Sequence, residues 1–497
     1  MYKTSTMKKI NVLLIFFFSS LYLFSQNITG RLVDKATGKP IPYATVKTGL
    51  HTGVISNEEG YFTVNFEDSK NKTIVISCMG YKEKTLSILD IESLNAVIPL
   101  EESVNELQMV FISNTTPNAD SIMAMVRKKV PTNYSNTLNT YRVFQRSTDW
   151  VNFKSLNFEI EKATHVKKQQ LNAANTDLNG LSKKARESDM LQFTDFKGVF
   201  YNLDKDSSKL VVDKVTKLMD FKNDFSLDEV QEKGQNIMLK YLDTTKTYKL
   251  KTGIFKIEDS LSLKSDDFEK NMNYEFELDY LNGMTRGLVK HGQFYDNSFL
   301  NKILNPDYYT YTFINTTFNN NQLTYVISFT PRKAKAKFSG KLFVSDDSHA
   351  VTRIDYSYYK DRHGEKINLK LILGVKYIAN LSEGLILFER GRDSIYFPKY
   401  IKQTTGSYFY VSRDLKFIEN SETKNKIGFS IKIEGNNKSK VELLVTENSN
   451  LTLNDFAAIE QAKVAPFERL SKYEDRIWKN DETLEPLSEM KDFKVED

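Results

Sequence analysis

The sequence predicts a mostly β protein with some α-helix, in which an N-terminal β-sandwich precedes a larger α+β unit with a curved antiparallel sheet. Short segments that alternate apolar and polar side chains, separated by Gly-containing turns, fill residues 28–100. Longer alternating segments recur between residues 308 and 418. The 497-residue chain is about two to three times too long for one ordinary core, which predicts a second unit.

The first unit is expected to be a sandwich because its side chains alternate with period two between turns. Phe62, Val64 and Phe66 alternate with polar residues, so one set can enter a shared interior. Turns are expected at residues 37–40 and 57–60, where glycine can take positive φ and proline fixes its own φ. Strands at spacings of about 8 to 12 residues are typical of a sandwich rather than a helical bundle.

The order of these segments is similar to that of a known domain family. They read ITGRLVD, PIPYATV, GVISNEEGYFTV, TIVISCMGYKEKTLSI and AVIPL, and Gly80 stands where the family pattern has a glycine. The pattern resembles the carboxypeptidase-like regulatory domain, a transthyretin-like β-sandwich that Bacteroidota bacteria place at the start of many envelope proteins. The resemblance implies a sandwich over residues 26–102 and a cell-envelope compartment, and it implies no particular reaction.

Residues 1–25 have the pattern of a secretory signal peptide. Three lysines precede an apolar stretch at residues 12–24 that is interrupted by two serines and followed by Ser25 and Gln26. The lysines are Lys3, Lys8 and Lys9. Removing them takes the formal charge from +5 to +2, so the basicity of the chain belongs partly to the signal.

Charge and cysteine content narrow the class of protein further. Basic residues are interleaved with acidic ones, so no nucleic-acid partner is expected. Cys78 is the one cysteine, expected as a buried thiol within a strand, which excludes an internal disulfide and a lipidated thiol after the signal. After residue 26 the sequence has no apolar run of about 18 residues, so no transmembrane helix is expected. We therefore expect an exported protein of the periplasm, soluble or peripherally associated with the outer membrane.

A linker at residues 103–117 is expected to lead into the larger unit at 118–470, which a C-terminal tail at 471–497 follows. A helix is expected over 119–130 behind the cap Asn118, with Pro131 ending it. Its apolar positions, Ile122, Met125, Val126 and Val130, recur at steps of three and four residues.

Several further elements of the larger unit are expected from local patterns. Residues 141–144 and 156–160 are predicted to be two paired strands, and the polar stretch 163–187 a solvated helix or a mobile loop. The capping box at residues 226–229 predicts a helix to about Leu242. Further strands are expected at 248–257, 308–318, 323–329, 338–344, 351–358, 367–376 and 408–418. Together they predict a large antiparallel sheet with helices on one side.

A second resemblance concerns this larger unit. The stretch from Ile327 to Tyr358, ISFTPRKAKAKFSGKLFVSDDSHAVTRIDYSY, resembles a segment of uncharacterised envelope proteins that join the same regulatory domain to a curved sheet akin to the lipoprotein-carrier half-barrel. The helix ADSIMAMVRKKV and the segment YEDRIWKNDETLEP also fit that group. This resemblance implies a curved sheet and assigns no catalytic residue.

A search for catalytic chemistry in the sequence predicts none. None of the histidines begins a His-x-x-Glu pair, and no HExxH, G-x-S-x-G, phosphate-loop or dinucleotide-binding pattern occurs. The histidines are His51, His165, His291, His349 and His363. Asp346, Asp347 and His349 could form a metal or acid–base site, but a hairpin turn explains them better, and a polar turn likewise explains Asp361 to Glu365. We expect no catalytic residue, no metal and no cofactor.

Aromatic residues concentrate on the strands of the larger unit. Cross-strand packing explains most of them, although an apolar concave face could also contact a lipid or sugar. They are Tyr308, Tyr309, Tyr311, Phe313, Tyr356, Tyr358, Tyr359, Tyr396, Phe397, Tyr400, Tyr408, Phe409 and Tyr410. If the sheet is a half-barrel, Leu342, Val344, Ile354 and Tyr356 should line one partly open face.

Three classes of function stay open from the sequence. The first is a non-enzymatic envelope protein whose sandwich contacts proteins while the sheet unit binds an apolar ligand or a partner. The second is a structural or assembly factor for outer-membrane complexes without a small ligand. The third is a hydrolase with an unrecognised cluster of Asp, Glu or His.

Export makes a direct prediction about the mature amino terminus. We expect the protein from envelope fractions to begin near Gln26, because the order of lysines, apolar run and small residue is that of a cleaved signal. Amino-terminal sequencing measures this. Recovery of a chain that still begins at Met1 would contradict the prediction.

Overall fold

The computed structural model describes residues 27–49, 52–65, 73–103, 117–187, 190–221, 236–237, 240, 242–253, 255–263, 275–319, 322–391, 393–479 and 481–495. The expected signal peptide, the helix starting at 226 and nearly all of the linker lie outside these residues. The chain divides into two compact units. One holds residues up to Val104 together with Asp475–Leu487, and the other holds most of the remaining chain.

The first unit is a β-sandwich, as predicted. One sheet has the order β4-β1-β7 and the other the order β3-β2-β5-β6. Their strands are β1 (Asn27–Asp34), β2 (Thr45–Lys47), β3 (Gly53–Ile55), β4 (Tyr61–Asn65), β5 (Thr73–Ser77), β6 (Lys84–Ser87) and β7 (Val97–Leu100), with the short helix α2 (Ile88–Ser93) after β6. Phe62 and Val64 are buried while their neighbours in β4 are less so, which confirms the predicted alternation.

The turn before β4 ties the C-terminal segment to the sandwich. The side-chain oxygen of Asn57 accepts hydrogen bonds from the backbone N–H groups of Glu59 and Tyr61, both at 2.9 Å. Its amide nitrogen donates to the carbonyl oxygens of Glu485 (3.2 Å) and Pro486 (3.1 Å). One buried asparagine therefore holds the turn and the segment Asp475–Leu487 together.

Cys78 differs from its prediction. It follows the last residue of β5 instead of lying within the strand, and its side chain is half-buried rather than buried. The strand ends at Ser77, so the alternation that buries Ile74 and Ile76 does not continue to Cys78.

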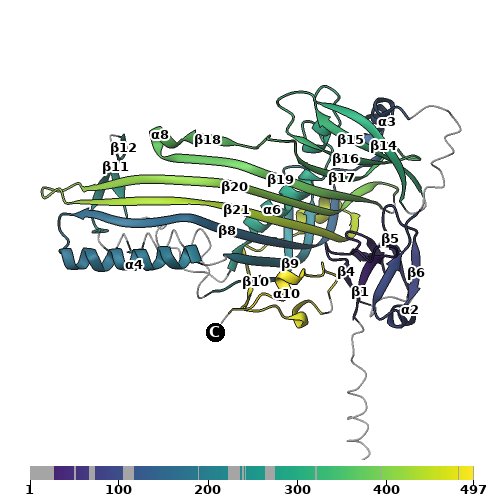
Figure 1. Ribbon diagram of the computed structural model, residues 1–497, viewed down its shortest axis with the longest axis horizontal. Helices are drawn as coiled ribbons and strands as arrows, with labels where there is room; N and C mark the ends of the chain where they lie inside the picture. The colour runs from purple at the N-terminus through teal and green to yellow at the C-terminus, as the bar shows by residue number, and fades with distance from the viewer. Residues whose placement is uncertain are drawn as a thin grey trace, which may run out of the picture. The chain divides into compact units, whose positions relative to one another are not determined.

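The second unit is built on a large curved sheet, as the sequence predicted. Its strands follow the order β14-β15-β16-β17-β19-β20-β21-β8-β9-β10-β23, with β11 beside β20 and β18 beside β19. Figure 1 shows that β8, β20 and β21 are the long strands of this sheet. The bounds are β8 (Asn139–Ala163), β9 (Leu191–Asn202), β10 (Ser208–Leu218), β11 (Thr247–Thr252), β12 (Phe255–Ser262), β14 (Tyr309–Asn319), β15 (Gln322–Pro331), β16 (Phe338–Ser345), β17 (Val351–Tyr358), β18 (Lys366–Leu369), β19 (Val375–Arg390), β20 (Tyr396–Glu419), β21 (Lys426–Asn450) and β23 (Glu468–Leu470).

Residues 141–144 and 156–160 belong to one strand, so the prediction of two paired strands is wrong. Both lie in β8, which pairs with β21 along its whole length. The register shifts between Glu434 and Gly435 of β21, which keeps apolar residues on one face beyond the shift. The polar middle of β8 hid this continuity, because it breaks the apolar alternation without breaking the backbone pairing.

Two other predicted strands are interrupted by glycines. Residues 248–257 form the hairpin β11–β12 around Gly253 (φ +55°), and 367–376 contain the one-turn helix α8 (Lys370–Leu373), which Gly374 (φ +60°) ends. A Cβ on Gly374 would collide with the carbonyl oxygen of Ser412. Both positions favour glycine because an L side chain rarely adopts positive φ.

Helix α3 (Ala119–Asn133) begins behind Asn118, whose side-chain oxygen accepts from the backbone N–H of Ser121, as predicted. Pro131 lies inside the helix, so the expectation that it ends the helix is wrong. The missing N–H of Pro131 falls in the last turn and removes one hydrogen bond, while the N–H of Tyr134 still bonds to the carbonyl of Val130.

Helix α4 (Lys168–Glu187) confirms the helical alternative for the polar stretch 163–187. Ala174, Leu178, Leu181 and Ala185 face one side and pack against apolar residues of β8 and β21. Figure 1 shows α4 running beside β8. These four residues recur at steps of three and four, which is the spacing of one helix face. The many polar residues between them made this apolar face difficult to recognise in the sequence.

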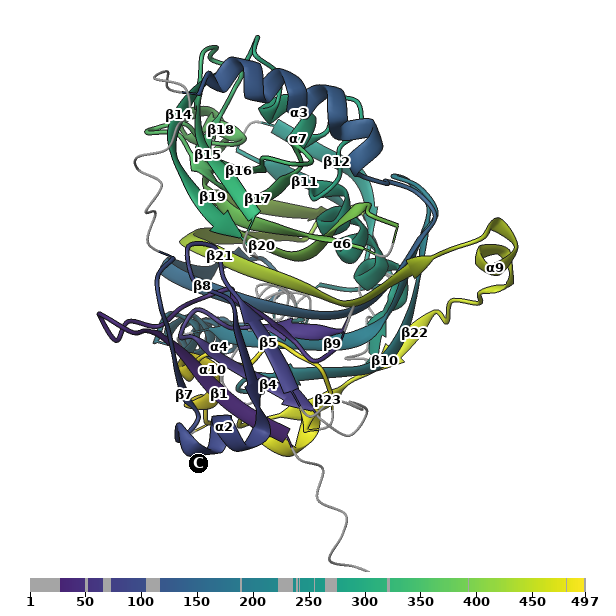
Figure 2. The ribbon, with the colours of Figure 1, turned by 90° about the vertical axis from the view of Figure 1, so that its right-hand side faces the viewer.

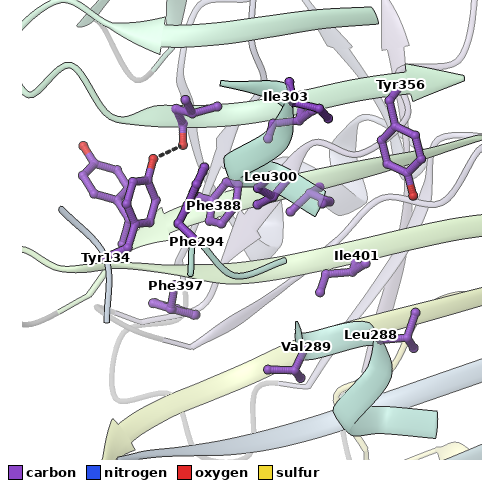
Figure 3. Close-up of a cluster of buried hydrophobic side chains, with 14 of the residues drawn as sticks. Tyr134, Leu288, Val289, Phe294, Leu300, Ile303, Tyr356, Phe388, Phe397 and Ile401 are labelled. Atoms are coloured by element: carbon purple, nitrogen blue, oxygen red, sulfur yellow. Dashed lines mark hydrogen bonds between the residues drawn. The ribbon is translucent and has the colours of Figure 1, made fainter. Parts of the chain in front are cut away.

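Helices α3, α6 (Leu278–His291) and α7 (Phe299–Ile303) cover one face of the sheet near its other end (Figure 2). Leu342, Val344, Ile354 and Tyr356 share that face as predicted, but they are 0–4% exposed. The expectation that this face is partly open is therefore wrong at these residues. Figure 3 shows Leu288, Val289, Leu300 and Ile303 of the helices within the same cluster.

A hydrogen bond fixes α6 on this apolar face. The hydroxyl of Thr285 in α6 donates to the side-chain oxygen of Gln145 in β8 at 3.0 Å, and both side chains are buried. Because a buried amide without a partner costs about 1–3 kcal/mol, this contact favours one position of the helix over others.

Every helix among the described residues is too short or too polar to span a lipid bilayer.

A buried ion pair joins β8 to β9. Arg146 donates to both carboxylate oxygens of Asp195, at 2.9 and 2.6 Å, and the two side chains are 6% and 0% exposed. The residues are direct cross-strand partners. Nearby, the Tyr400 hydroxyl donates to Glu442, which pairs across the ladder with Arg146, so the charges alternate from strand to strand.

We expect Arg146→Met to lower the free energy of unfolding by about 3–5 kcal/mol, because it leaves the Asp195 carboxylate buried without its partner. The double variant with Asp195→Leu should recover most of this loss. Arg142→Met, on the same strand but in an exposed pair with Asp213, should cost less than about 1 kcal/mol. Urea unfolding compares the three, and equal losses at Arg142 and Arg146 would contradict the prediction.

Candidate functional site

The residues that the sequence suggested as a site lie in turns. Asp346, Asp347 and His349 form the turn between β16 and β17, and His349 has a φ of +54°. Asp347 accepts hydrogen bonds from the Ser345 hydroxyl and the Ser348 backbone N–H, and the first of these contributes most to lowering its pKa. Residues 361–365 likewise lie between β17 and β18. The carboxylate of Asp347 therefore stabilises its own turn, and residues 361–365 lie in a second turn.

The described histidines do not converge on one place. No group of three His, Cys, Asp or Glu side chains with metal-binding geometry occurs in the part of the chain that the structure describes. His291, in the last turn of α6, is the one that enters the sheet unit's interior. Its Nε2 lies 2.8 Å from the hydroxyl of Tyr356, and its ring stacks on Phe299 with 4.0 Å between centroids. Burial lowers the pKa of His291 to about 4.

A cavity of about 480 Å³ lies where three segments of the sheet unit meet. The segments are the approach to β8, the turn between β19 and β20, and the end of β21. Its lining residues are Ser135, Thr137, Leu138, Asn139, Gly391, Asp393, Ile395, Tyr396, Phe397, Asn448, Ser449, Asn450 and Leu451. We call it the strand-end cavity, and its volume is within the range of small-molecule sites.

Backbone hydrogen bonds hold the walls of the strand-end cavity. The N–H of Leu451 donates to the carbonyl of Leu138 at 2.9 Å, which joins the end of β21 to the approach to β8. The N–H of Gly391 donates to the carbonyl of Ile395 at 2.8 Å and closes the third wall. Leu138 and Ser394 both have positive φ, at +55° and +62°. Such conformations cost about 1–3 kcal/mol for residues other than glycine and persist where the surroundings enforce them.

The polar side chains of the cavity are mainly amides and hydroxyls. Asn450 donates to the carboxylate of Asp393 at 3.1 Å, and Asn139 donates to the carbonyl of Thr137 at 2.9 Å. The side-chain oxygen of Asn448 is buried and has no hydrogen-bond partner in the structure. Asn448 therefore carries a costly unmet acceptor within the wall of the cavity.

Apolar surface completes the cavity. Leu138, Ile395, Tyr396 and Phe397 supply it, and Tyr396 also shares a hydrogen bond of 3.1 Å with Ser348. Asp393 is the charged side chain among the described lining residues. The amides, hydroxyls and aromatic faces among the described lining residues can recognise a hydroxyl-rich molecule through hydrogen bonds and ring contacts.

Sequence reasoning missed this cavity. Tyr396 and Phe397 were singled out, but only as members of an aromatic cluster, and the segments that meet there are separated by some 50 to 310 residues. The run Asn448-Ser449-Asn450 is the one local signal, because three small polar residues at a strand end suggest exposed hydrogen-bonding groups. This run does not by itself indicate which other segments of the chain lie beside it in the cavity.

The chain thus combines a small β-sandwich with a curved-sheet unit that holds a polar cavity. Residues 28–112 match the model of the CarboxypepD_reg-like domain, which confirms the resemblance for the N-terminal domain. A search of characterised proteins found no match to the sequence. Among solved structures, a domain from Vibrio parahaemolyticus, provisionally assigned to outer membrane lipoprotein sorting, is similar with 7% identity and a TM-score of 0.22, covering 68% of this chain and 97% of that one.

The depressed pKa of His291 predicts a pH dependence of stability. A folded-state pKa of about 4, against about 6.5 in the unfolded chain, means that the unfolded chain binds the proton first as pH falls. His291 should therefore lower the free energy of unfolding as the pH falls from about 6.5 to about 4. Relative to His291→Gln, we expect the wild type to lose an additional 1–2 kcal/mol, approximately, between pH 7 and 5. Urea unfolding at both pH values measures it, with His349→Gln as the control. Parallel losses in all three proteins would contradict the assignment.

Proposed function

We propose that this is a non-enzymatic cell-envelope protein whose sheet unit binds a small, neutral, hydroxyl-rich ligand in the strand-end cavity. The observation that carries the proposal is the cavity itself, with its lining of amides, hydroxyls and aromatic rings. The signal-peptide pattern at residues 1–25 and the CarboxypepD_reg-like domain support an envelope location.

Burial of the predicted apolar face favours a polar ligand over an apolar one. The protein's own helices α3, α6 and α7 occupy that face, and Leu342 and Ile354 have no exposed surface. An acyl chain would have to displace these packed side chains. The free energy lost by exposing them would be about as large as the free energy gained by burying the acyl chain. The strand-end cavity needs no such displacement.

Binding is favoured over hydrolysis by the groups that the cavity presents. Asp393 and Tyr396 are the titratable side chains among the described lining residues, and Asn450 holds the carboxylate of Asp393. Hydrolysis by general acid–base catalysis usually needs a second acid or base within reach of the same bond. The lining offers hydrogen-bond recognition instead.

Calorimetry with a panel of neutral mono- and disaccharides tests the proposal. We expect at least one to bind the mature protein, and Asn448→Leu to weaken that binding by roughly tenfold or more, because the variant removes an amide from the lining of the cavity. Asn152→Leu, an exposed asparagine on β8, is the matched control and should bind as the wild type does.

Three results would contradict the proposal. One is failure of every neutral sugar to bind, and another is equal weakening by Asn448→Leu and Asn152→Leu. The third is release of a hydrolysis product from a bound disaccharide. Binding of a fatty acid that Asn448→Leu leaves unchanged would instead favour an apolar site elsewhere in the chain.

A further inference from the structure

The hairpin formed by β18, α8 and the start of β19 exposes apolar side chains at its tip. Leu371 is 101% exposed and Ile372 70% exposed, while Ile367 and Leu369 of β18 are about 40% exposed. We call these four residues the apolar tip. Two large aliphatic side chains side by side with most of their surface in water are unusual on a soluble surface, and they mark an interaction site.

Lysines surround the apolar tip. Lys366, Lys370 and Lys376 lie within the same hairpin, and residues 366–376 contain no Asp or Glu. The three charges therefore accompany the apolar residues, and the nearest acidic residue in the sequence is Glu365, directly before Lys366. Aliphatic stems of lysine can lie along an apolar medium while the ammonium groups stay at its polar boundary.

Tyrosines on the adjoining strand form a second layer behind the tip. The ammonium group of Lys370 lies 4.1 Å from the ring centroid of Tyr410, and that of Lys376 lies 5.2 Å from the ring of Tyr408. The acidic residue beside this layer, Glu434, accepts a hydrogen bond from the Tyr408 hydroxyl at 3.0 Å. Tyrosine and lysine beside exposed aliphatic residues are typical of segments at a membrane–water boundary.

We propose that the apolar tip inserts into an anionic lipid surface. Leu371 projects fully from the hairpin, so it is suited to a soft apolar medium that closes around it. The three lysines complement the negative headgroups that would surround such an insertion. The tip is a peripheral anchor, since one short hairpin supplies a few apolar side chains and no membrane-spanning segment.

The anchor and the strand-end cavity lie at opposite ends of β19. The strand runs 16 residues from Val375 beside the tip to Arg390 beside the cavity turn. At about 3.3 Å per residue, these ends are roughly 50 Å apart. The two candidate sites are therefore well separated within the sheet unit.

Flotation of the mature protein with vesicles tests the anchor. We expect it to float with vesicles of phosphatidylcholine containing one quarter phosphatidylglycerol, more weakly with pure phosphatidylcholine, and less as salt rises. The pair Leu371→Glu and Ile372→Glu should weaken vesicle binding by roughly tenfold or more, because the buried aliphatic area is lost and charge is added. Both residues are exposed, so the change should leave the fold intact.

The matched control is Leu453→Glu, which alters another exposed leucine, 65% exposed, in the short helix α9 (Leu453–Ala458). It should float as the wild type does. Equal loss in this control and in the tip variant would overturn the proposal, as would absence of wild-type flotation with the anionic vesicles. A dimer in sedimentation that the tip substitutions convert to monomer would assign the tip to self-association and would also overturn it.

Discussion

Continuous pairing among β20, β21 and β8 is the constraint on which the sheet unit depends. Strand β21 is hydrogen-bonded to β20 on one side and to β8 on the other over nearly all of its length. Since the side-chain period of a strand is two, this register decides which residues meet the helices and which meet the opposite face. The strand pairing also places both candidate sites, because the cavity forms where β21 ends and β8 begins, and the apolar tip lies beside the start of β19.

The helices on the sheet decide what kind of ligand the unit can hold. Helices α6 and α7 fill the apolar face, and Thr285 anchors α6 to Gln145 within it. Because the protein's own helices cover this apolar face, the face contributes to the stability of the fold and has little surface for a ligand. Ligand binding is then more favourable at the strand ends, where backbone pairing stops. The residues at those ends carry amide and hydroxyl groups, which are free to hydrogen-bond to water or to a ligand because strand pairing does not use them.

Strands with a clear apolar alternation were predictable from the sequence, whereas their continuity and interruptions were not. Strand β17 has the predicted bounds, because Ile354 and Tyr356 alternate with polar neighbours in a short segment between turns. Strand β8 looked like two strands because its middle holds Arg146 and other polar residues, which cross-strand partners such as Asp195 make tolerable. The cavity could not be predicted, since Leu138, Ile395 and Asn448 become neighbours only when distant strands pair.

Local sequence patterns are enough to predict a mostly β fold, an N-terminal sandwich of the regulatory type and the side-chain faces of the short strands. These follow from period-two alternation and turn residues, which act over a few residues. The folded chain adds three features that these patterns do not contain: helices fill the apolar face of the sheet, a polar cavity lies at the strand ends, and Leu371 and Ile372 protrude. Those features depend on which strands pair and where each one ends, and non-local pairing sets both.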